Sequence, residues 1–591
     1  MNNSRRGRLV CLLITVFALS PDLCAAQTAS EQLERLAVQA NERELDLFPL
    51  MEVFSRGPGP RQDRIELTLS DEHRERQRAH HRWILGELER ISIAELTDTE
   101  QLTHALLGWQ ARDSLEWLTH PFHQRSPLLH LRPGIAFNLI DVIDAQPFRD
   151  EADYHAWFRR LRHFMAFLAN AEDVMREGII AGITTPRVLV EFALAQLNAL
   201  TPKDVTTSTF WKPILRLPPS IDAETRATLE ADYRSVLADE LFPALRQLAA
   251  FGRNEYLPKA RTTNGFGALP GGDAMYRYLV RSETTTDLTP DEIHALGLSE
   301  MKRIQAGFLA AAQNAGFNGK VGEITGWLRD KPDNYPFTSG EEILKYLEGI
   351  QARIVPQLPT LFGRLPKSRF EIRLADPAIA ARTPPRYMPP NDAGRPGVFA
   401  MPVVDPRKVS RADLATILAH EGMPGHHLDA GIKLENSVPD FRRRMWINAF
   451  GEGWALYAES LGHELGLYEQ PLDLIGRYAF DLLRACRLVV DTGVHAKGWT
   501  HAQAIGFLLD ECGQTQSFAT TEVLRYMAWP AQALSYKTGE LAILELRAQA
   551  EKRLGARFDL RAFHDVVLAE GHLPISMMRQ RVKAWIEKLG K

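Results

Sequence analysis

The sequence has little cysteine. Only four cysteines occur among 591 residues, and two of them, Cys11 and Cys24, lie in the first 26 residues. The remaining pair, Cys486 and Cys512, is consistent with one disulfide in an oxidising compartment and equally with two reduced, buried thiols. A cysteine nucleophile is not favoured, because the residues that carry chemistry in this chain are His and Glu.

Basic runs and long apolar segments are also missing. Lys and Arg number 70 against 74 Asp and Glu, which gives a formal net charge of −4. No basic run suggests a nucleic-acid partner, and no apolar stretch after residue 26 is long enough to span a membrane. Internal repeats and low-complexity tracts are absent too, and nothing in the sequence specifies an oligomeric state.

The first 26 residues have the pattern of a cleavable signal peptide. Three arginines precede an apolar stretch over residues 9–19, and Cys24-Ala25-Ala26 offers small residues for cleavage. A lipid-anchored start at Cys24 is the less favoured alternative, since Pro21-Asp22-Leu23 lacks the small residues that such processing usually requires. Cleavage removes three Arg and one Asp and moves the formal charge from −4 to −6. We therefore expect a periplasmic or secreted protein.

Residues 417–427 form the most informative segment, Ile-Leu-Ala-His-Glu-Gly-Met-Pro-Gly-His-His. A His-Glu pair with further histidines close behind is typical of a zinc hydrolase that sets imidazole ligands beside a general base. The usual second histidine stands at i+4, but here that position is Pro424, which has no N–H and opens the helix. A Pro-Gly bulge that absorbs two residues would make His426 the second ligand, and one that absorbs three would select His427.

We favour His426 as the second ligand of this motif, beside His420. Three interpretations without a metal compete with it: a solvated surface pair, histidines that only contact the terminal carbonyls of a helix, and a helix that simply ends at Pro-Gly and leaves its histidines in solvent.

A second segment supplies carboxylates. Residues 441–465 place apolar side chains at helical spacing, which predicts a long, largely buried helix. Glu452 and Glu459 lie seven residues apart on one face of it. Because a carboxylate on an apolar helix is costly unless it is paired or bound, we predict Glu452 as the third metal ligand. Glu459 would orient a ligand histidine, and ion pairs with Arg or Lys are the alternative for both residues.

These motifs resemble the bacterial DUF885 family, which is placed among zinc metallopeptidases of the gluzincin kind. The resemblance rests on the segment at 420–427, on Gly-Glu-Gly-Trp-Ala-Leu-Tyr-Ala-Glu at 451–459, and on blocks at residues 490–500 and 525–539. It covers most of the mature chain. It implies a mainly α, two-lobed fold with a small β element beside the active-site helix, a bound Zn²⁺ ion, and hydrolysis of short peptides.

The expected domain organisation follows from length and composition. About 565 mature residues exceed what one core normally holds. A Pro/Gly/Thr-rich segment from about residue 257 to 290 is the favoured boundary. We predict a signal peptide over residues 1–26, an N-terminal helical lobe over 27–268 and a C-terminal catalytic lobe over 269–591.

Two strands are predicted just before the metal motif, at residues 368–374 and 397–403, and Pro402 favours an edge or an end for the second. The resemblance implies that residues 395–401, which include Arg395, form a shelf on which a substrate peptide pairs as an added strand. A small structural hairpin is the alternative.

The predicted mechanism gives each candidate residue a role. Zinc held by His420, His426 and Glu452 leaves one position open for water, and Glu421 takes the proton of that water. We predict two donors to the oxyanion, His495 and Tyr536, and two residues that bind the substrate carboxylate, Tyr526 and Lys537. Ordinary burial or ion pairing is the alternative for these four residues.

Two other functions compete with a peptidase: a zinc-stabilised helical binding protein, and a hydrolase of non-peptide amides. The unligated base Glu421 argues for an enzyme, because structural zinc sites are usually closed by four protein ligands.

Overall fold

The computed structural model describes residues 27–590 except 58, 67–68, 121–141, 376–379, 381–383 and 393. The described chain is mainly α-helical and has one small sheet, which confirms the predicted fold class. Every helix in the described ranges is too short or too polar to cross a membrane. The predicted signal peptide lies outside these residues.

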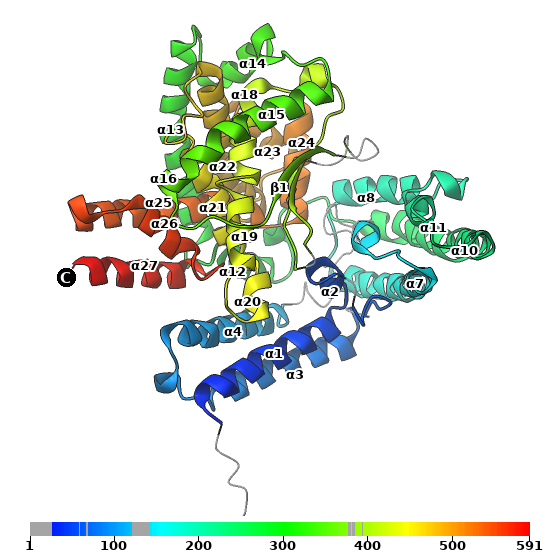
Figure 1. Ribbon diagram of the computed structural model, residues 1–591. Helices are drawn as coiled ribbons and strands as arrows, with labels where there is room; N and C mark the ends of the chain where they lie inside the picture. The colour runs from blue at the N-terminus through cyan, green and yellow to red at the C-terminus, as the bar shows by residue number, and fades with distance from the viewer. Residues whose placement is uncertain are drawn as a thin grey trace, which may run out of the picture.

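The N-terminal part contributes two groups of helices (Figure 1). The first group packs side by side and lies at the bottom of the view: α1 (Ala29–Leu47), α3 (Asp71–Leu88) and α4 (Asp98–Trp117). The second encloses a core of residues between 142 and 260: α7 (Glu151–Ala181), α8 (Arg187–Leu200), α10 (Ala223–Ser235) and α11 (Phe242–Phe251). The short helix α2 (Leu50–Ser55) lies between α1 and α3 in the sequence, and α9 (Lys212–Leu215) lies between α8 and α10.

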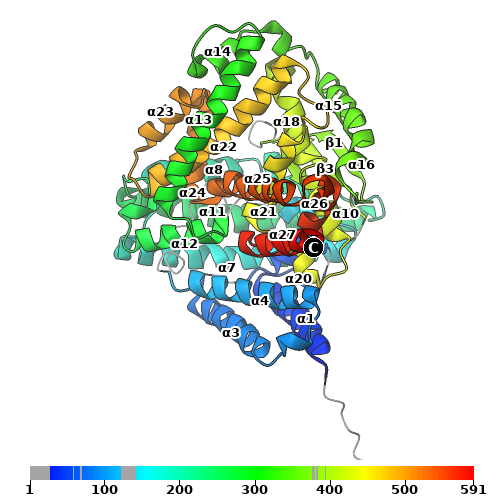
Figure 2. The same ribbon diagram turned by 90° about the vertical axis from the view of Figure 1, so that its left-hand side faces the viewer.

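The C-terminal part is built around two long helices that lie side by side in both ribbon views (Figure 2). These are α13 (Pro290–Asn314) and α22 (Pro471–His495), and Gly297 of α13 lies directly against α22. The other helices here are α12 (Gly272–Thr284), α14 (Ile324–Arg329), α15 (Gly340–Ile354), α16 (Leu358–Leu361), α18 (Arg411–Glu421), α19 (His426–Leu434), α20 (Asp440–Arg444), α21 (Asn448–Ser460), α23 (His501–Asp510), α24 (Gln516–Ala528), α25 (Ser535–Leu554), α26 (Leu560–Leu568) and α27 (Ile575–Gly590).

The sheet has three strands in the order β1-β3-β2: β1 (Phe370–Leu374), β3 (Gly397–Met401) and β2 (Arg386–Met388). β3 runs parallel to β1 and antiparallel to β2, and it is buried along its length. The predicted shelf at residues 395–401 is therefore wrong, because the strand within it has a neighbour on both sides. Pro402 marks the end of β3.

One hydrophobic core connects distant parts of the sequence. It joins buried residues between 29 and 111 to residues between 337 and 586, including the apolar faces of α18, α19 and α21. The helices that carry the metal motif therefore share their core with α1, α3 and α4. The boundary near residue 268 stays a prediction.

A disulfide joins Cys486 in α22 to Cys512, which follows α23. Both residues are buried.

Candidate metal centre

The metal motif lies where α18 ends and α19 begins. α18 stops at Glu421, the chain turns through residues 422–425, and α19 starts at His426. The sequence predicted a bulge within one helix, but the structure has two helices joined by a tight turn. A Cβ at Gly425 would lie 2.0 Å from the carbonyl oxygen of His420, so this turn requires glycine. The close approach brings His426 back beside His420.

Three hydrogen bonds hold the turn. The amide of Gly422 donates to the carbonyl of Leu418 at 2.8 Å, and the amide of His427 donates to the carbonyl of Gly422 at 3.0 Å. The indole Nε1 of Trp454 in α21 donates to the carbonyl of Pro424 at 3.0 Å. The turn is thus fixed to the helix that carries Glu452.

His420, His426 and Glu452 direct their ligand atoms at one another. Nε2 of His420 and Nε2 of His426 each lie 3.5 Å from Oε2 of Glu452, and the three atoms lie within 4.8 Å of one another. Two ligands that share a tetrahedral ion at about 2.1 Å are about 3.4 Å apart, so this spacing fits a metal ion. Oε2 of Glu452 is buried and forms no hydrogen bond within the described residues, a costly arrangement that a bound cation would relieve.

The charges of this group suit a metal site. Burial alone would lower the pKa of His420, but the carboxylates of Glu452 and Glu459 raise it to about 9. Burial would raise the pKa of Glu452, yet His420 and His426 hold it well below its usual value. Glu452 is therefore ionised, as a metal ligand must be, whereas His420 would have to give up a proton when a metal binds, because a ligand imidazole is neutral.

Glu459 lies behind His420. Its Oε1 accepts a hydrogen bond from Nδ1 of His420 at 2.8 Å and another from Arg484 at 3.1 Å, and its side chain is fully buried. This bond fixes the imidazole so that Nε2 faces Glu452. A carboxylate in this position commonly orients a metal-binding histidine.

Glu421 follows His420 and is partly exposed. Its carboxylate makes no hydrogen bond or ion pair with any residue that the structure describes. Burial raises its pKa, and the nearby imidazoles of His420 and His426 offset part of that rise. Glu421 is thus a carboxylate beside the three ligand atoms, and no described residue pairs with its oxygens.

His427 faces the sheet instead of the three ligand atoms. Its Nδ1 lies 2.9 Å from the hydroxyl of Tyr387, its Nε2 lies 3.2 Å from the carbonyl of Ser368, and its ring stacks on Phe370. Both ring nitrogens are occupied, so the geometry selects His426 from the two histidines.

The two predicted oxyanion donors lie in different surroundings. The ring of Tyr536 stacks near that of His420 at 6.4 Å between centroids, and the side chain is partly exposed. His495 is fully committed: Nδ1 accepts from the amide of Phe266 at 3.2 Å, and Nε2 lies 3.0 Å from the carbonyl of Tyr526. The role predicted for His495 is therefore wrong, because neither nitrogen is available to a substrate.

The residues predicted to bind the substrate carboxylate are mostly buried. The hydroxyl of Tyr526 donates to Glu522 at 2.6 Å, and Lys537 pairs with Asp481 and Glu540 inside the protein. Both predictions are wrong, since these groups already have buried partners. Arg395 is exposed and donates to the carbonyl of Pro389 at 3.0 Å.

Two aromatic residues near His426 were not predicted. Tyr387 in β2 stacks at 6.2 Å from the ring of His426, and Trp446, just before α21, lies at 5.8 Å. Neither stands near a histidine motif in the sequence, so only the fold reveals them.

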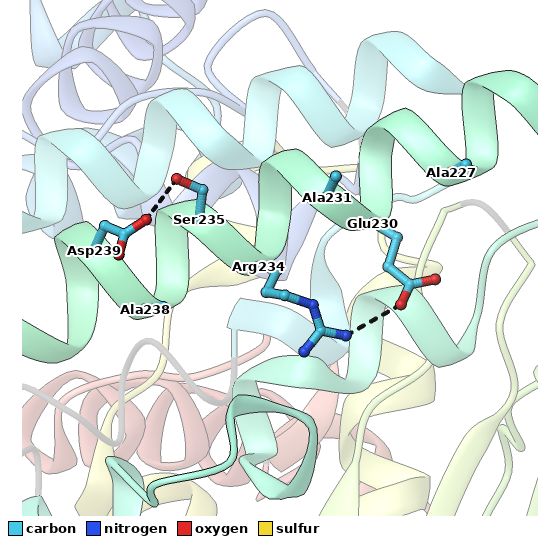
Figure 3. A pocket seen from close by; sticks show the side chains of 7 residues that line it. All are labelled: Ala227, Glu230, Ala231, Arg234, Ser235, Ala238 and Asp239. Atoms are coloured by element: carbon cyan, nitrogen blue, oxygen red, sulfur yellow. Dashed lines mark hydrogen bonds and ion pairs between the residues drawn. The ribbon is translucent and has the colours of Figure 1, made fainter.

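A surface hollow lies elsewhere, on α10 and the π-helix Val236–Leu241 that follows it (Figure 3). Its charged side chains pair with neighbours in the hollow, Arg234 with Glu230 at 3.2 Å and Asp239 with Ser235 at 2.8 Å. It brings no ligand or catalytic group to the metal centre.

The model of the family described as "Bacterial protein of unknown function (DUF885)" matches residues 53–582. The chain belongs to this family. The match includes every residue of the candidate metal centre, so the centre lies in the DUF885 part of the chain. No curated protein matches the chain.

The solved structures that are similar to this DUF885 protein include two that are described as putative lipoproteins. One, described as a putative lipoprotein from Colwellia psychrerythraea, is 26% identical with a TM-score of 0.87, covering 95% of this chain and 100% of that one. The other, described as a putative lipoprotein of unknown function from Shewanella oneidensis, is 17% identical with a TM-score of 0.72, covering 94% and 99%. The second likeness shows the fold alone.

Proposed function

We propose that this DUF885 protein is a zinc-dependent peptidase that hydrolyses short peptides. The observation that carries the proposal is the uncommitted carboxylate of Glu421 beside the ligand atoms of His420, His426 and Glu452. A purely structural site would have no use for such a base.

The ligand set fits zinc, since two imidazoles and one carboxylate leave a coordination position open. When bound, zinc would supply Lewis-acid chemistry by lowering the pKa of a water molecule and polarising the scissile carbonyl. Glu421 takes the proton of the attacking water and delivers it to the leaving amine. Tyr536 is the donor that we assign to the oxyanion, since its ring lies beside His420 and its side chain is partly exposed.

The sheet supports a peptide substrate in a different way from the one first predicted. β2 is an outer strand of the described sheet, and Tyr387 within it stacks near His426. We place a bound peptide along β2, where it would pair as an added strand. Arg395, close to this strand in the sequence and exposed, stays a candidate for contact with the substrate.

An extracytoplasmic location is part of the proposal. The two similar structures from Colwellia psychrerythraea and Shewanella oneidensis are described as putative lipoproteins, and no described helix could span a membrane. The sequence pattern of residues 1–26 adds a signal peptide to this proposal.

The experiment that tests the function is profiling of a short-peptide mixture with zinc-loaded protein. We expect cleavage by the wild type, and we expect Glu421→Gln to lower kcat/KM by about 10²-fold or more while zinc content stays unchanged. Glu341→Gln, at the exposed start of α15, is the control and should be fully active. No cleavage by zinc-loaded wild-type protein would overturn the proposal.

A further inference from the structure

Glu283 lies at the end of α12, close to the start of α21. Oε2 of Glu283 accepts a hydrogen bond from the side-chain amide nitrogen of Asn448, Nδ2, at 2.5 Å. Oε1 accepts one from the indole Nε1 of Trp529 at 3.2 Å. Both donors are neutral, and the carboxylate is partly exposed. In the described chain, no Lys, Arg or His forms an ion pair with it.

A chain of contacts connects Glu283 to the metal centre. Asn448, which holds Glu283, stands one helical turn before Glu452, so the two side chains share a face of α21. Nε1 of Trp446 donates to the amide oxygen of Asn448 at 2.7 Å, and the Trp446 ring lies 5.8 Å from that of His426. Glu283 therefore lies on the same side of α21 as the ligand atoms.

The spacing along α21 sets the length of a peptide that could reach from the metal centre to Glu283. One helical turn between Asn448 and Glu452 spans about 6 Å. The hydrogen bond to Glu283 adds a further 2.5 Å. Together these lengths give about 8.5 Å, which corresponds to two to three residues of extended peptide.

The backbone around Glu283 is fixed before any ligand binds. The hydroxyl of Ser535 in α25 donates to the carbonyl of Glu283 at 3.0 Å. Two residues further on, the hydroxyl of Thr285 accepts from the amide of Ile575, the first residue of α27, at 2.9 Å. Two other helices thus anchor the end of α12, and the carboxylate is held in place without a cation.

The electrostatics and the neighbouring rings favour a cation at this position. Partial burial raises the pKa of Glu283 to about 7, although the hydrogen bonds from Asn448 and Trp529 oppose the rise. A cation beside the carboxylate would stabilise its charged form and so oppose this rise in pKa. Trp446 and Trp529 are 49% and 37% exposed, so part of each side chain is open to solvent. Nζ of Lys433 already lies 5.5 Å from the centre of the Trp446 ring, which shows that a cation can be placed against this ring.

We propose that Glu283, with Trp446 and Trp529, forms a subsite for a protonated amine of the substrate, two to three residues from the cleaved bond. The proposal rests on the proposed peptidase function and names the substrate class: short peptides with a free amine at that distance. The amine is either the peptide's own N-terminus or a lysine side chain. Glu283 binds it through a charge-assisted hydrogen bond.

The test compares zinc-loaded wild type, Glu283→Gln and a control on peptides with a free or an N-acetylated terminus. Each acetylated peptide is also made with lysine or norleucine near the amino end. Glu116→Gln is the matched control, because Glu116 is exposed and pairs with Arg281 near the end of α12. Melting temperature and zinc content verify that the variants fold.

We expect the wild type to show a KM about tenfold or more lower for peptides with an amine than for those without. Glu283→Gln should abolish this preference by raising KM for the amine peptides, while Glu116→Gln keeps it. A lower KM for the free terminus than for the acetylated one identifies the N-terminus as the amine. A lower KM for acetylated peptides with lysine than for those with norleucine identifies the lysine side chain.

Two results overturn the inference while the peptidase function stands: equal cleavage of peptides with and without an amine, or an unchanged preference in Glu283→Gln. Binding of the same peptides to the wild type, measured by calorimetry, separates the two proposals. If no peptide is cleaved but those with an amine bind in a manner that depends on Glu283, the peptidase function fails and the amine subsite stands.

Discussion

At Gly425 the backbone passes so close to the end of α18 that a single added methyl group would collide with it. A Cβ at this position would lie 2.0 Å from the carbonyl oxygen of His420 and 2.5 Å from that of Ala419. We predict that Gly425→Ala lowers the free energy of unfolding by about 2 kcal/mol or more and weakens zinc binding, because the turn must open and move His426. Thermal unfolding and zinc titration measure the two effects.

Gly506→Ala in α23 is the control for this substitution. A Cβ there meets no atom within 4 Å, so alanine should leave stability unchanged or raise it by up to about 1 kcal/mol. If Gly425→Ala behaves like Gly506→Ala, the turn does not depend on the close approach.

At the residue scale the sequence predicted which residues come together better than it predicted how their side chains are oriented. His420, Glu421 and Glu452 follow from residue type and spacing, since a buried carboxylate on an apolar helix needs a partner. The choice between His426 and His427 depends on Ser368 and Tyr387, which occupy the nitrogens of His427 from distant segments. No local pattern carries that information.

At the scale of elements, α21 carries both the ligand Glu452 and the supporting residue Glu459. We predict that Glu459→Gln weakens zinc affinity about 10- to 100-fold, because an amide holds the Nδ1 proton of His420 less strongly than a carboxylate does. Titration against a competing chelator measures the affinity.

Glu464→Gln provides the comparison, since Glu464 lies just beyond α21 and pairs with Arg547 on the surface. Its zinc affinity should equal that of the wild type. Equal affinities in all three proteins would mean that Glu459 does not support His420.

The helices were more predictable than the sheet. Alternating side chains indicate a strand but not its neighbours, and strand order depends on contacts between distant segments. The sequence therefore located β3, and Pro402 follows its end as one of the two predicted alternatives, but the edge position that the resemblance implied is wrong. Buried ion pairs also depend on contacts between distant segments. Lys537 pairs with Asp481 of α22, which lies 56 residues away in the sequence.

At the scale of the whole molecule, the disulfide between Cys486 and Cys512 closes a loop with a sequence separation of 26 residues. We predict that replacing both cysteines by alanine lowers the free energy of unfolding by about 3 kcal/mol, chiefly because the unfolded chain gains freedom. Denaturant unfolding measures this change, and mass spectrometry of the non-reduced wild type should show both thiols missing. Free thiols in oxidised wild-type protein would contradict the bond.

The mainly α fold was predictable from helical spacing, but its assembly was not. Residues between 29 and 111 share a core with residues between 337 and 586, and nothing in their local patterns indicates that they meet. Burial of apolar surface specifies that each helix must pack, whereas its partner is determined by the fold as a whole.

The most direct test of the metal centre is the zinc content of His426→Ala compared with that of His427→Ala. We predict about one zinc ion per chain in the wild type and in folded His427→Ala, and loss of zinc in His426→Ala. The reason is that, of these two histidines, only His426 directs a nitrogen at Glu452. Full zinc content in His426→Ala, or its loss in His427→Ala, would contradict the ligand set of His420, His426 and Glu452.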